Sequence, residues 1–129
     1  MPIRLPARIG NAKHARHLFV IHVDTKIRDK AIQALSDNGI GVTVNYRSVP
    51  TLTFYREKYG YDVDRFPISH EWGEGTISLP LYLSITREEQ NHVIAVVENE
   101  IVPMIERMNR TADLARLCIT FSSRAPVDT

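Results

Sequence analysis

Residues 39–50 read GIGVTVNYRSVP, and this stretch decides how the rest of the chain can be arranged. Gly39 suits the end of a helix, because glycine readily takes the left-handed conformation found there. From residue 42 apolar and polar residues alternate, as they do in a strand whose side chains point to opposite faces. We therefore expect a strand over 42–47 that ends at Ser48-Val49-Pro50.

The two faces of this expected strand differ in chemistry. One face carries apolar and aromatic side chains: Val42, Val44 and Tyr46. The other carries polar side chains: Thr43, Asn45 and Arg47. A polar outer face is normal for a half-buried strand, so the pattern favours an ordinary strand. An amide beside a guanidinium can also present a polar site, and that alternative stays open.

Length and composition indicate one soluble globular domain. The chain has 129 residues, of which 43% are hydrophobic and 24% are charged. Its formal net charge of +1 gives no electrostatic argument for a nucleic acid or an anionic membrane as partner. The single cysteine, Cys118, cannot form an internal disulfide, which suits a reducing compartment. No apolar run is long enough to span a membrane, and the first residues lack a signal-peptide core. We expect a cytoplasmic protein.

The first strong strand signal is residues 18–24. Both of its faces carry apolar residues, which is typical of a strand inside a sheet. His22 lies on this strand, and a structural role is favoured over a ligand or base because no carboxylate or thiol can be placed beside it. Asp24-Thr25 then predicts a helix cap, with Thr25 at the N-cap, for a helix that runs to Asn38-Gly39.

The middle of the chain concentrates aromatic residues around two short predicted helices. The first helix ends at Gly60, and the second runs from residue 68 to 74 after Phe66-Pro67. The aromatic residues are Phe54, Tyr55, Tyr59, Tyr61 and Phe66. They form either a satellite cluster under a loop or a patch that packs on a partner, since aromatic side chains are favoured in interface cores.

The last third predicts a strand and a long helix. Residues 76–82 alternate again, and Pro80 either ends this strand or places it at an edge. Thr86 and Glu89 fit a capping box, which starts an amphipathic helix through Met108. Pro103 should kink or interrupt that helix.

Both ends of the chain are expected to be irregular. Residues 1–13 are predicted to be an N-terminal arm, and 110–129 a tail in which 117–121 forms a short strand and 122–129 is disordered. His14 and His17 lie three residues apart, but no further ligand accompanies them, so a solvated basic segment is favoured over a metal site.

The motifs taken together resemble the DegT/DnrJ/EryC1/StrS aminotransferases. The matching segments follow in order and with family-like spacing: HLFVIHV, LSDNGIGVTVNYRSVP, FYREKYGY, FPISHEWGEGTISLPLY and ITREEQNHVIAVV. The match is to the C-terminal small domain of these enzymes and places that domain at 14–109. It implies pyridoxal-phosphate chemistry on nucleotide-linked sugars, as in polysaccharide biosynthesis, for the full-length family.

The same resemblance implies that this chain has no cofactor of its own. The family's Schiff-base lysine, its pyridine-binding aspartate and its phosphate-binding residues belong to the large domain. Lys13, Lys26, Lys30 and Lys58 stand in none of the family's lysine contexts. A Schiff-base lysine needs a desolvated position beside the cofactor. We therefore expect no catalytic residue, no cofactor-binding residue and no metal ligand here.

Substrate contacts are the role that the resemblance leaves to this chain. In the family, the end of the central strand approaches the sugar nucleotide, which makes Asn45, Tyr46 and Arg47 the candidate substrate-binding residues. A guanidinium suits a phosphate by geometry. The family usually has histidine at the position of Asn45. The substrate contact that this histidine makes in the family is therefore in question here.

The expected fold is α+β, with a small, mainly antiparallel sheet of three or more strands and helices packed largely on one face. We expect the isolated small domain of a nucleotide-sugar aminotransferase, inactive alone. The alternative is a stand-alone binding or assembly module. The opening methionine and the unmatched tail favour an independent gene. An enzyme acting alone ranks third. Apolar surface at Leu18, Val20, Val49, Leu52 and Phe54 predicts a homodimer or a complex with a large-domain chain.

Overall fold

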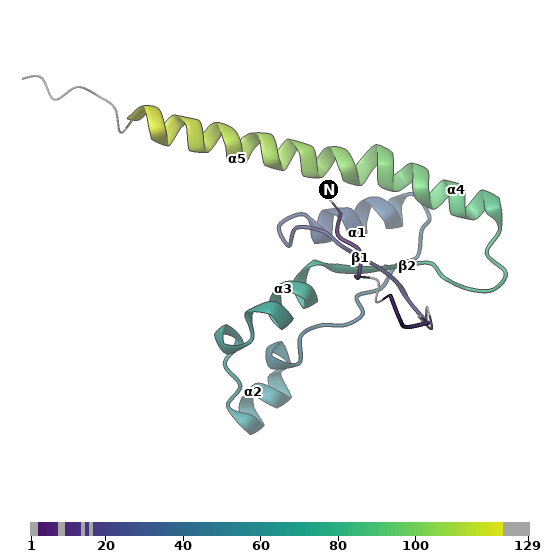
Figure 1. Cartoon of the computed structure of the whole chain (residues 1–129), viewed down its shortest axis with the longest axis horizontal. Coiled ribbons are helices and arrows are strands. Elements are labelled where there is room, and N and C mark those ends of the chain that lie inside the picture. The colour runs from purple at the N-terminus through teal and green to yellow at the C-terminus, as the bar shows by residue number, and fades with distance from the viewer. Residues whose placement is uncertain (1–2, 8–9, 14, 16, 123–129) are drawn as a thin grey trace, which may run out of the picture.

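The computed structural model describes residues 3–7, 10–13, 15 and 17–122 (Figure 1). Helices outnumber strands in this part of the chain. In order the elements are β1 (Phe19–His22), α1 (Arg28–Asp37), η1 (Val49–Thr51), α2 (Thr53–Tyr59), η2 (Val63–Arg65), α3 (Pro67–Gly75), β2 (Thr76–Leu79), α4 (Arg87–Val96), η3 (Val97–Ile101) and α5 (Val102–Ser122).

The sheet has two antiparallel strands, β1 and β2, with Ile21 opposite Ile77. Each outer edge is extended by one isolated bridge: Arg4 pairs with His22, and Thr43 pairs with Ser78. In the described residues the prediction of three or more strands is therefore wrong, although the small antiparallel sheet is confirmed.

The expected strand over 42–47 is reduced to its bridge at Thr43. Thr43 exchanges two backbone hydrogen bonds with Ser78, with N···O distances of 2.8 and 3.3 Å. Two residues later the carbonyl of Asn45 accepts from the hydroxyl of Thr76, at 3.4 Å, instead of from a backbone N–H. A side chain thus replaces the next rung of the ladder, and the segment leaves the sheet.

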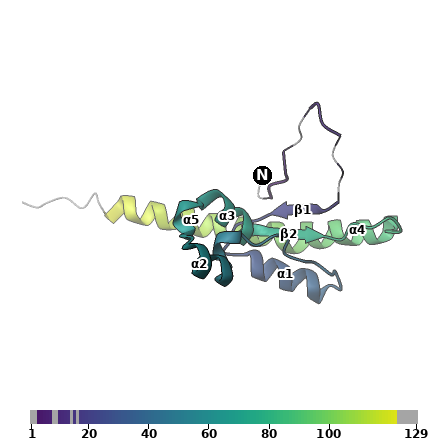
Figure 2. The same ribbon diagram turned by 90° about the horizontal axis from the view of Figure 1, so that it is seen from below.

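The core lies between one sheet face and two helical segments. Ile21 and Ile77 pack with Ala31 and Leu35 of α1, and the long helix contributes Ile101. In Figure 1, α1 and the long helix lie above the strands and α3 and α2 lie below them. Figure 2 shows the N-terminal arm running out beside β1. The prediction that helices pack largely on one face holds for α1, α4 and α5, whereas α3 contacts the face that carries His22.

The long helix, formed by α4, η3 and α5, continues through Pro103, where a kink or an interruption was expected. Elements α4, η3 and α5 follow without a break, and η3 is a π-helical turn that ends two residues before Pro103. Proline lacks the N–H that an α-helical turn needs, and a π turn is one way to absorb such an irregularity. Ile101 is fully buried in this turn, so the irregular turn also packs against the core.

Two local predictions are wrong. The strand over 117–121 does not form, because these residues belong to α5. Thr25 is not the N-cap of α1, which starts at Arg28 after Ile27. The Asp24 carboxylate accepts from the Lys26 N–H at 2.9 Å. The resulting turn places Ile27 in the core before the helix begins. Of the expected disordered segment 122–129, residues 123–129 lie outside the described residues.

Several predicted helix boundaries are confirmed. Gly39 and Gly60 have φ values of 74° and 64° and stop α1 and α2 in the left-handed region. The capping box at Thr86 and Glu89 is formed. Among the described residues, none of the helices combines the length and apolar character needed to cross a membrane.

Candidate functional site

The candidate residues Asn45, Tyr46 and Arg47 lie on an irregular segment between the Thr43 bridge and η1. The peptide bond between Asn45 and Tyr46 is cis. The Tyr46 side chain is 70% exposed, Arg47 is exposed, and Asn45 is half-buried. The three residues thus stand together at the surface, beside the outer edge of β2.

The amide of Asn45 is oriented by its neighbours. The Thr43 hydroxyl donates to Asn45 Oδ1 at 2.6 Å, and the Thr76 hydroxyl donates to the Asn45 backbone carbonyl. With Oδ1 acting as acceptor, the Nδ2 protons are directed away from Thr43. The three ion pairs found among the described residues do not involve Arg47. The segment therefore presents an amide donor and a guanidinium two residues apart.

The end of this segment is fixed against α3. Ser48 is buried, and its hydroxyl lies 2.8 Å from the hydroxyl of Ser69. Gly73 packs so closely that a Cβ there would lie 2.5 Å from the Ser48 backbone nitrogen. Only glycine allows this approach, so the backbone after Arg47 has a fixed position on α3.

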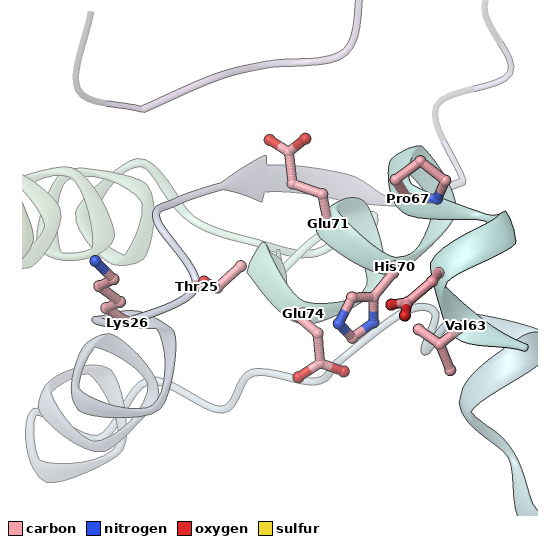
Figure 3. A pocket seen from close by; sticks show the side chains of 8 residues that line it. Thr25, Lys26, Val63, Pro67, His70, Glu71 and Glu74 are labelled. Atoms are coloured by element: carbon pink, nitrogen blue, oxygen red, sulfur yellow. The ribbon is translucent and has the colours of Figure 1, made fainter.

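A separate hollow of about 580 Å³ lies between the start of α1 and the η2–α3 region (Figure 3). Its ionisable lining residues are Lys26, Asp64, His70, Glu71 and Glu74. It contains none of the three candidate residues, and its carboxylates do not suit a phosphate. Figure 3 shows the Glu71 carboxylate directed away from His70 and Glu74.

Two of the three carboxylates of this hollow, Glu71 and Glu74, are paired with arginines. Glu71 forms an ion pair with Arg4, and this hydrogen bond and charge lower the pKa of the Glu71 carboxyl. Glu74 lies 3.7 Å from the Arg28 guanidinium. Within the described residues, no group of three or more histidine, cysteine, aspartate or glutamate side chains is arranged to hold a metal ion.

The lysines do not fit pyridoxal phosphate. Lys13, Lys26, Lys30 and Lys58 are all exposed, whereas a Schiff-base lysine must be desolvated against its cofactor. The Lys58 ammonium lies over the aromatic rings of Phe54 and Tyr59, 5.1 and 5.4 Å from their centroids. No step of pyridoxal-phosphate chemistry is assigned to this chain.

The aromatic residues of the middle region form one continuous cluster on α2 and the segment after it. Tyr55, Tyr59 and Tyr61 stack on one another with centroid distances of 5.7 to 6.5 Å, and Phe54 and Phe66 flank them. Phe54 is 58% exposed and Tyr59 is 53% exposed. The cluster is therefore a surface feature rather than one buried under a loop.

One cluster was missed by sequence reasoning. His22 is a structural histidine, as predicted, because it is 2% exposed and hydrogen-bonded. Its partners are Arg4 and the backbone carbonyl of Glu71, which lie far from it in the sequence. The Trp72 ring lies beside the His22 ring, with 4.6 Å between centroids and the two planes tilted by 55°. The available signal was a lone histidine within an apolar strand.

This small sheet, with its long helix and central loop, is an aminotransferase-like fold. The structure is similar to a protein assigned as a sugar aminotransferase, Spr1654 of Streptococcus pneumoniae in its PMP form, with a TM-score of 0.74 and 26% identity over 84% of this chain and 28% of that chain. The aminotransferase TlmJ of Streptoalloteichus hindustanus has a TM-score of 0.64 at 19% identity, over 80% of this chain and 27% of that chain.

The sequence identifies the family. Residues 2–98 match the model of the DegT/DnrJ/EryC1/StrS aminotransferase family, and the chain belongs to that family. It is 34% identical over 94 residues to the spore coat polysaccharide biosynthesis protein SpsC of Bacillus subtilis. That alignment covers 69% of this chain and 24% of SpsC, so the chain spans about a quarter of its relative's length.

Proposed function

We propose that this chain is the small domain of a sugar aminotransferase and contributes substrate contacts beside a large domain. The cofactor, pyridoxal phosphate, would be held by the large domain, where it supplies the Schiff-base chemistry of amino transfer. Support comes from the family match and from the quarter of the relatives' length that the chain covers. The name of SpsC, which refers to polysaccharide biosynthesis, supports a sugar as substrate class.

The observation that carries the proposal is the exposed Arg47 two residues from an Asn45 amide whose Oδ1 already accepts from Thr43. An amide Nδ2 and a guanidinium two residues apart can both donate to the oxygens of a diphosphate. The exposed Tyr46 ring between them offers a face for the base or sugar. Because Ser48 is fixed on Gly73, this segment has little freedom to move away from a ligand. We therefore propose a nucleotide diphosphate sugar as the ligand class.

The substitution Arg47→Ala tests this site. Following backbone amide shifts during titration with uridine and thymidine diphosphate sugars, we expect changes centred on residues 43–48. Binding by the 129-residue chain alone should be weak, because the other half of the site is absent. Loss of one charged hydrogen bond should weaken binding by about 10-fold or more.

Arg65→Ala is the matched control, because Arg65 is an exposed arginine on η2, away from Asn45. Its affinity should equal that of the unaltered chain. Shifts that cluster in another part of the molecule, or equal affinities for both variants, would overturn the assignment.

The second candidate is a stand-alone binding or assembly module. The exposed aromatic cluster on α2 favours it, since aromatic side chains are common anchors of protein interfaces. The two candidates differ in what accompanies the chain. A neighbouring reading frame that encodes the matching large domain, and whose product co-purifies with this chain, would support the aminotransferase proposal. Its absence would favour the module.

A further inference from the structure

Asn38 and Gly39 form the exposed C-terminal end of α1, and Asn38 is the one asparagine of the chain that is followed by a glycine. Asparagine is thermolabile, because the backbone nitrogen of the next residue can attack its side-chain amide. Glycine in that next position favours the attack, since no side chain hinders the approach of its nitrogen. Nothing lies within 4 Å of a Cβ placed on Gly39, so solvent can reach the reacting groups.

The folded chain holds both reacting groups in hydrogen bonds. The Gly39 N–H, whose nitrogen is the nucleophile, donates to the Ser36 carbonyl at 2.9 Å. Nδ2 of Asn38, which is the leaving group, donates to the Ala34 carbonyl at 2.8 Å. The left-handed φ of 74° at Gly39 belongs to the same cap. Attack therefore requires the cap to open, and any contact that holds the cap closed slows the reaction.

A further hydrogen bond to this cap comes from another helix. Nε2 of His92 on α4 lies 2.9 Å from the backbone carbonyl of Asn38. A carbonyl can only accept, so Nε2–H is the donor. This carbonyl belongs to the same planar peptide unit as the Gly39 nitrogen. His92 therefore holds the peptide unit that contains the nucleophile, and it does so from a separate element of the fold.

We propose that Asn38 is a deamidation site and that His92 controls the rate of the reaction. When the cap opens, the Gly39 nitrogen forms a bond to Cγ of Asn38 and the bond between Cγ and Nδ2 breaks. The proton of the Gly39 N–H leaves with Nδ2 as ammonia, and a cyclic succinimide remains. Water then opens this ring at one of its two carbonyls. Opening at one carbonyl gives aspartate, and opening at the other gives isoaspartate, in which the backbone runs through the former side chain.

The product changes the end of α1 and the segment that follows it. A carboxylate at position 38 cannot donate to the Ala34 carbonyl, and it places a negative charge at the end of the helix where the macrodipole disfavours it. Isoaspartate also lengthens the backbone just before Ile40, which is buried and donates to the Leu35 carbonyl at 2.9 Å. Deamidation should therefore loosen the turn that leads from α1 to the Thr43 bridge.

Peptide mass spectrometry of the whole chain, incubated in warm neutral buffer, tests the proposal. We expect the mass gain of deamidation at Asn38 before any other asparagine, and more slowly in the folded chain than in guanidinium chloride. His92→Phe keeps an aromatic ring and removes the donor, and it should fold because the His92 side chain is exposed. It should speed the reaction of the folded chain by about 2- to 12-fold, the effect of losing one hydrogen bond, and leave the rate in denaturant unchanged.

Hydrogen exchange of the Gly39 amide measures cap opening directly, and its protection should fall by the same factor in His92→Phe. His70→Phe is the matched control, because His70 is an exposed histidine on α3 beside the residues that precede α1, and its folded chain should react at the unaltered rate. Equal rates for folded His92→Phe and the unaltered chain would overturn the role of His92. Modification that does not favour Asn38, or none at Asn38 in folded His92→Phe, would overturn the site.

Discussion

At the scale of single residues, the two glycines of α3 determine how closely this helix approaches its neighbours. Gly73 admits the backbone of Ser48, and Gly75 admits the ring of His22 and the carbonyl of Val23. Neither glycine has a positive φ among the described residues, so their role is space rather than backbone conformation. Both the proposed substrate segment and the position of the His22 ring depend on this close packing.

Gly75→Ala should destabilise the fold. The added Cβ would lie 2.4 Å from His22 Nε2 and 2.5 Å from the Val23 carbonyl oxygen, and both atoms belong to groups that cannot shift easily. Overpacking of this kind costs about 1–3 kcal/mol. Urea unfolding followed by circular dichroism measures the change.

Gly41→Ala is the control for that experiment, since nothing lies within 4 Å of a Cβ at Gly41. Its free energy of unfolding should stay within about 0.5 kcal/mol of the unaltered chain. Equal stability of the two variants would show that α3 shifts to accommodate the methyl group.

Residue-level patterns reach only contacts that lie within one short segment. Asn45, Tyr46 and Arg47 were chosen from such a segment and from the family resemblance, and their role in binding a substrate stays a prediction. The contacts of His22 could not be found, because Arg4 and Glu71 reach it from separate elements and only the fold brings them together. A sequence pattern reports neighbours along the chain, whereas this cluster consists of neighbours in space.

At the scale of elements, signals contained within a few residues were the reliable ones. The left-handed glycines at 39 and 60 and the capping box all depend on local backbone geometry, and the structure has them. The third strand failed because strand formation depends on a partner, and the Thr76 hydroxyl takes the carbonyl that the ladder needed. The segment 117–121 failed because it continues a helix whose start lies far upstream.

The capping box of α4 yields a prediction about stability and its pH dependence. The Thr86 hydroxyl accepts from the Glu89 N–H at 3.1 Å, and the Glu89 carboxylate accepts from the Thr86 N–H at 2.8 Å. The backbone hydrogen bond from Thr86 lowers the pKa of Glu89. Thr86→Ala should cost about 1 kcal/mol, whereas Thr86→Ser, which keeps the hydroxyl, should cost less.

The lowered pKa of Glu89 determines how the free energy of unfolding changes with pH. Because folding lowers the pKa of Glu89, its charge contributes stability above the ordinary glutamate range, and this contribution is lost as pH falls through the lowered value. The stability difference between the unaltered chain and Glu89→Gln should therefore shrink on acidification, measured by thermal unfolding at several pH values. A constant difference would mean that the charge of Glu89 makes no contribution.

At the scale of the whole molecule, many large apolar side chains of the described residues are exposed. Val49 and Phe54 are exposed, as expected, while Leu18, Val20 and Leu52 are half-buried. Phe19, Ile68 and Leu83 are further exposed apolar residues. Burial of ~500 Å² of such surface would contribute on the order of 12 kcal/mol before the costs of association.

We therefore expect a homodimer or a tight complex with a large-domain chain rather than an isolated monomer. Sedimentation velocity at micromolar concentration measures this. Removal of residues 111–129 shortens α5 and keeps Met104, Ile105 and Met108, which pack on the core, and comparison with the full chain tests whether the end of α5 takes part. A single monomeric species in both cases would contradict the prediction.

The two-stranded sheet has a consequence for the order of folding. Its strands are joined by α1, α2 and α3, so β1 must wait until β2 has been synthesised and a long loop has closed. Closing such a loop costs entropy before any hydrogen bond between β1 and β2 can form. The continuous helix from α4 to α5 needs only neighbouring residues, and Ile101 in its π turn then offers an apolar surface to α1. Assembly should therefore proceed from the helices inward, with the pairing of Ile21 and Ile77 among the last contacts to form.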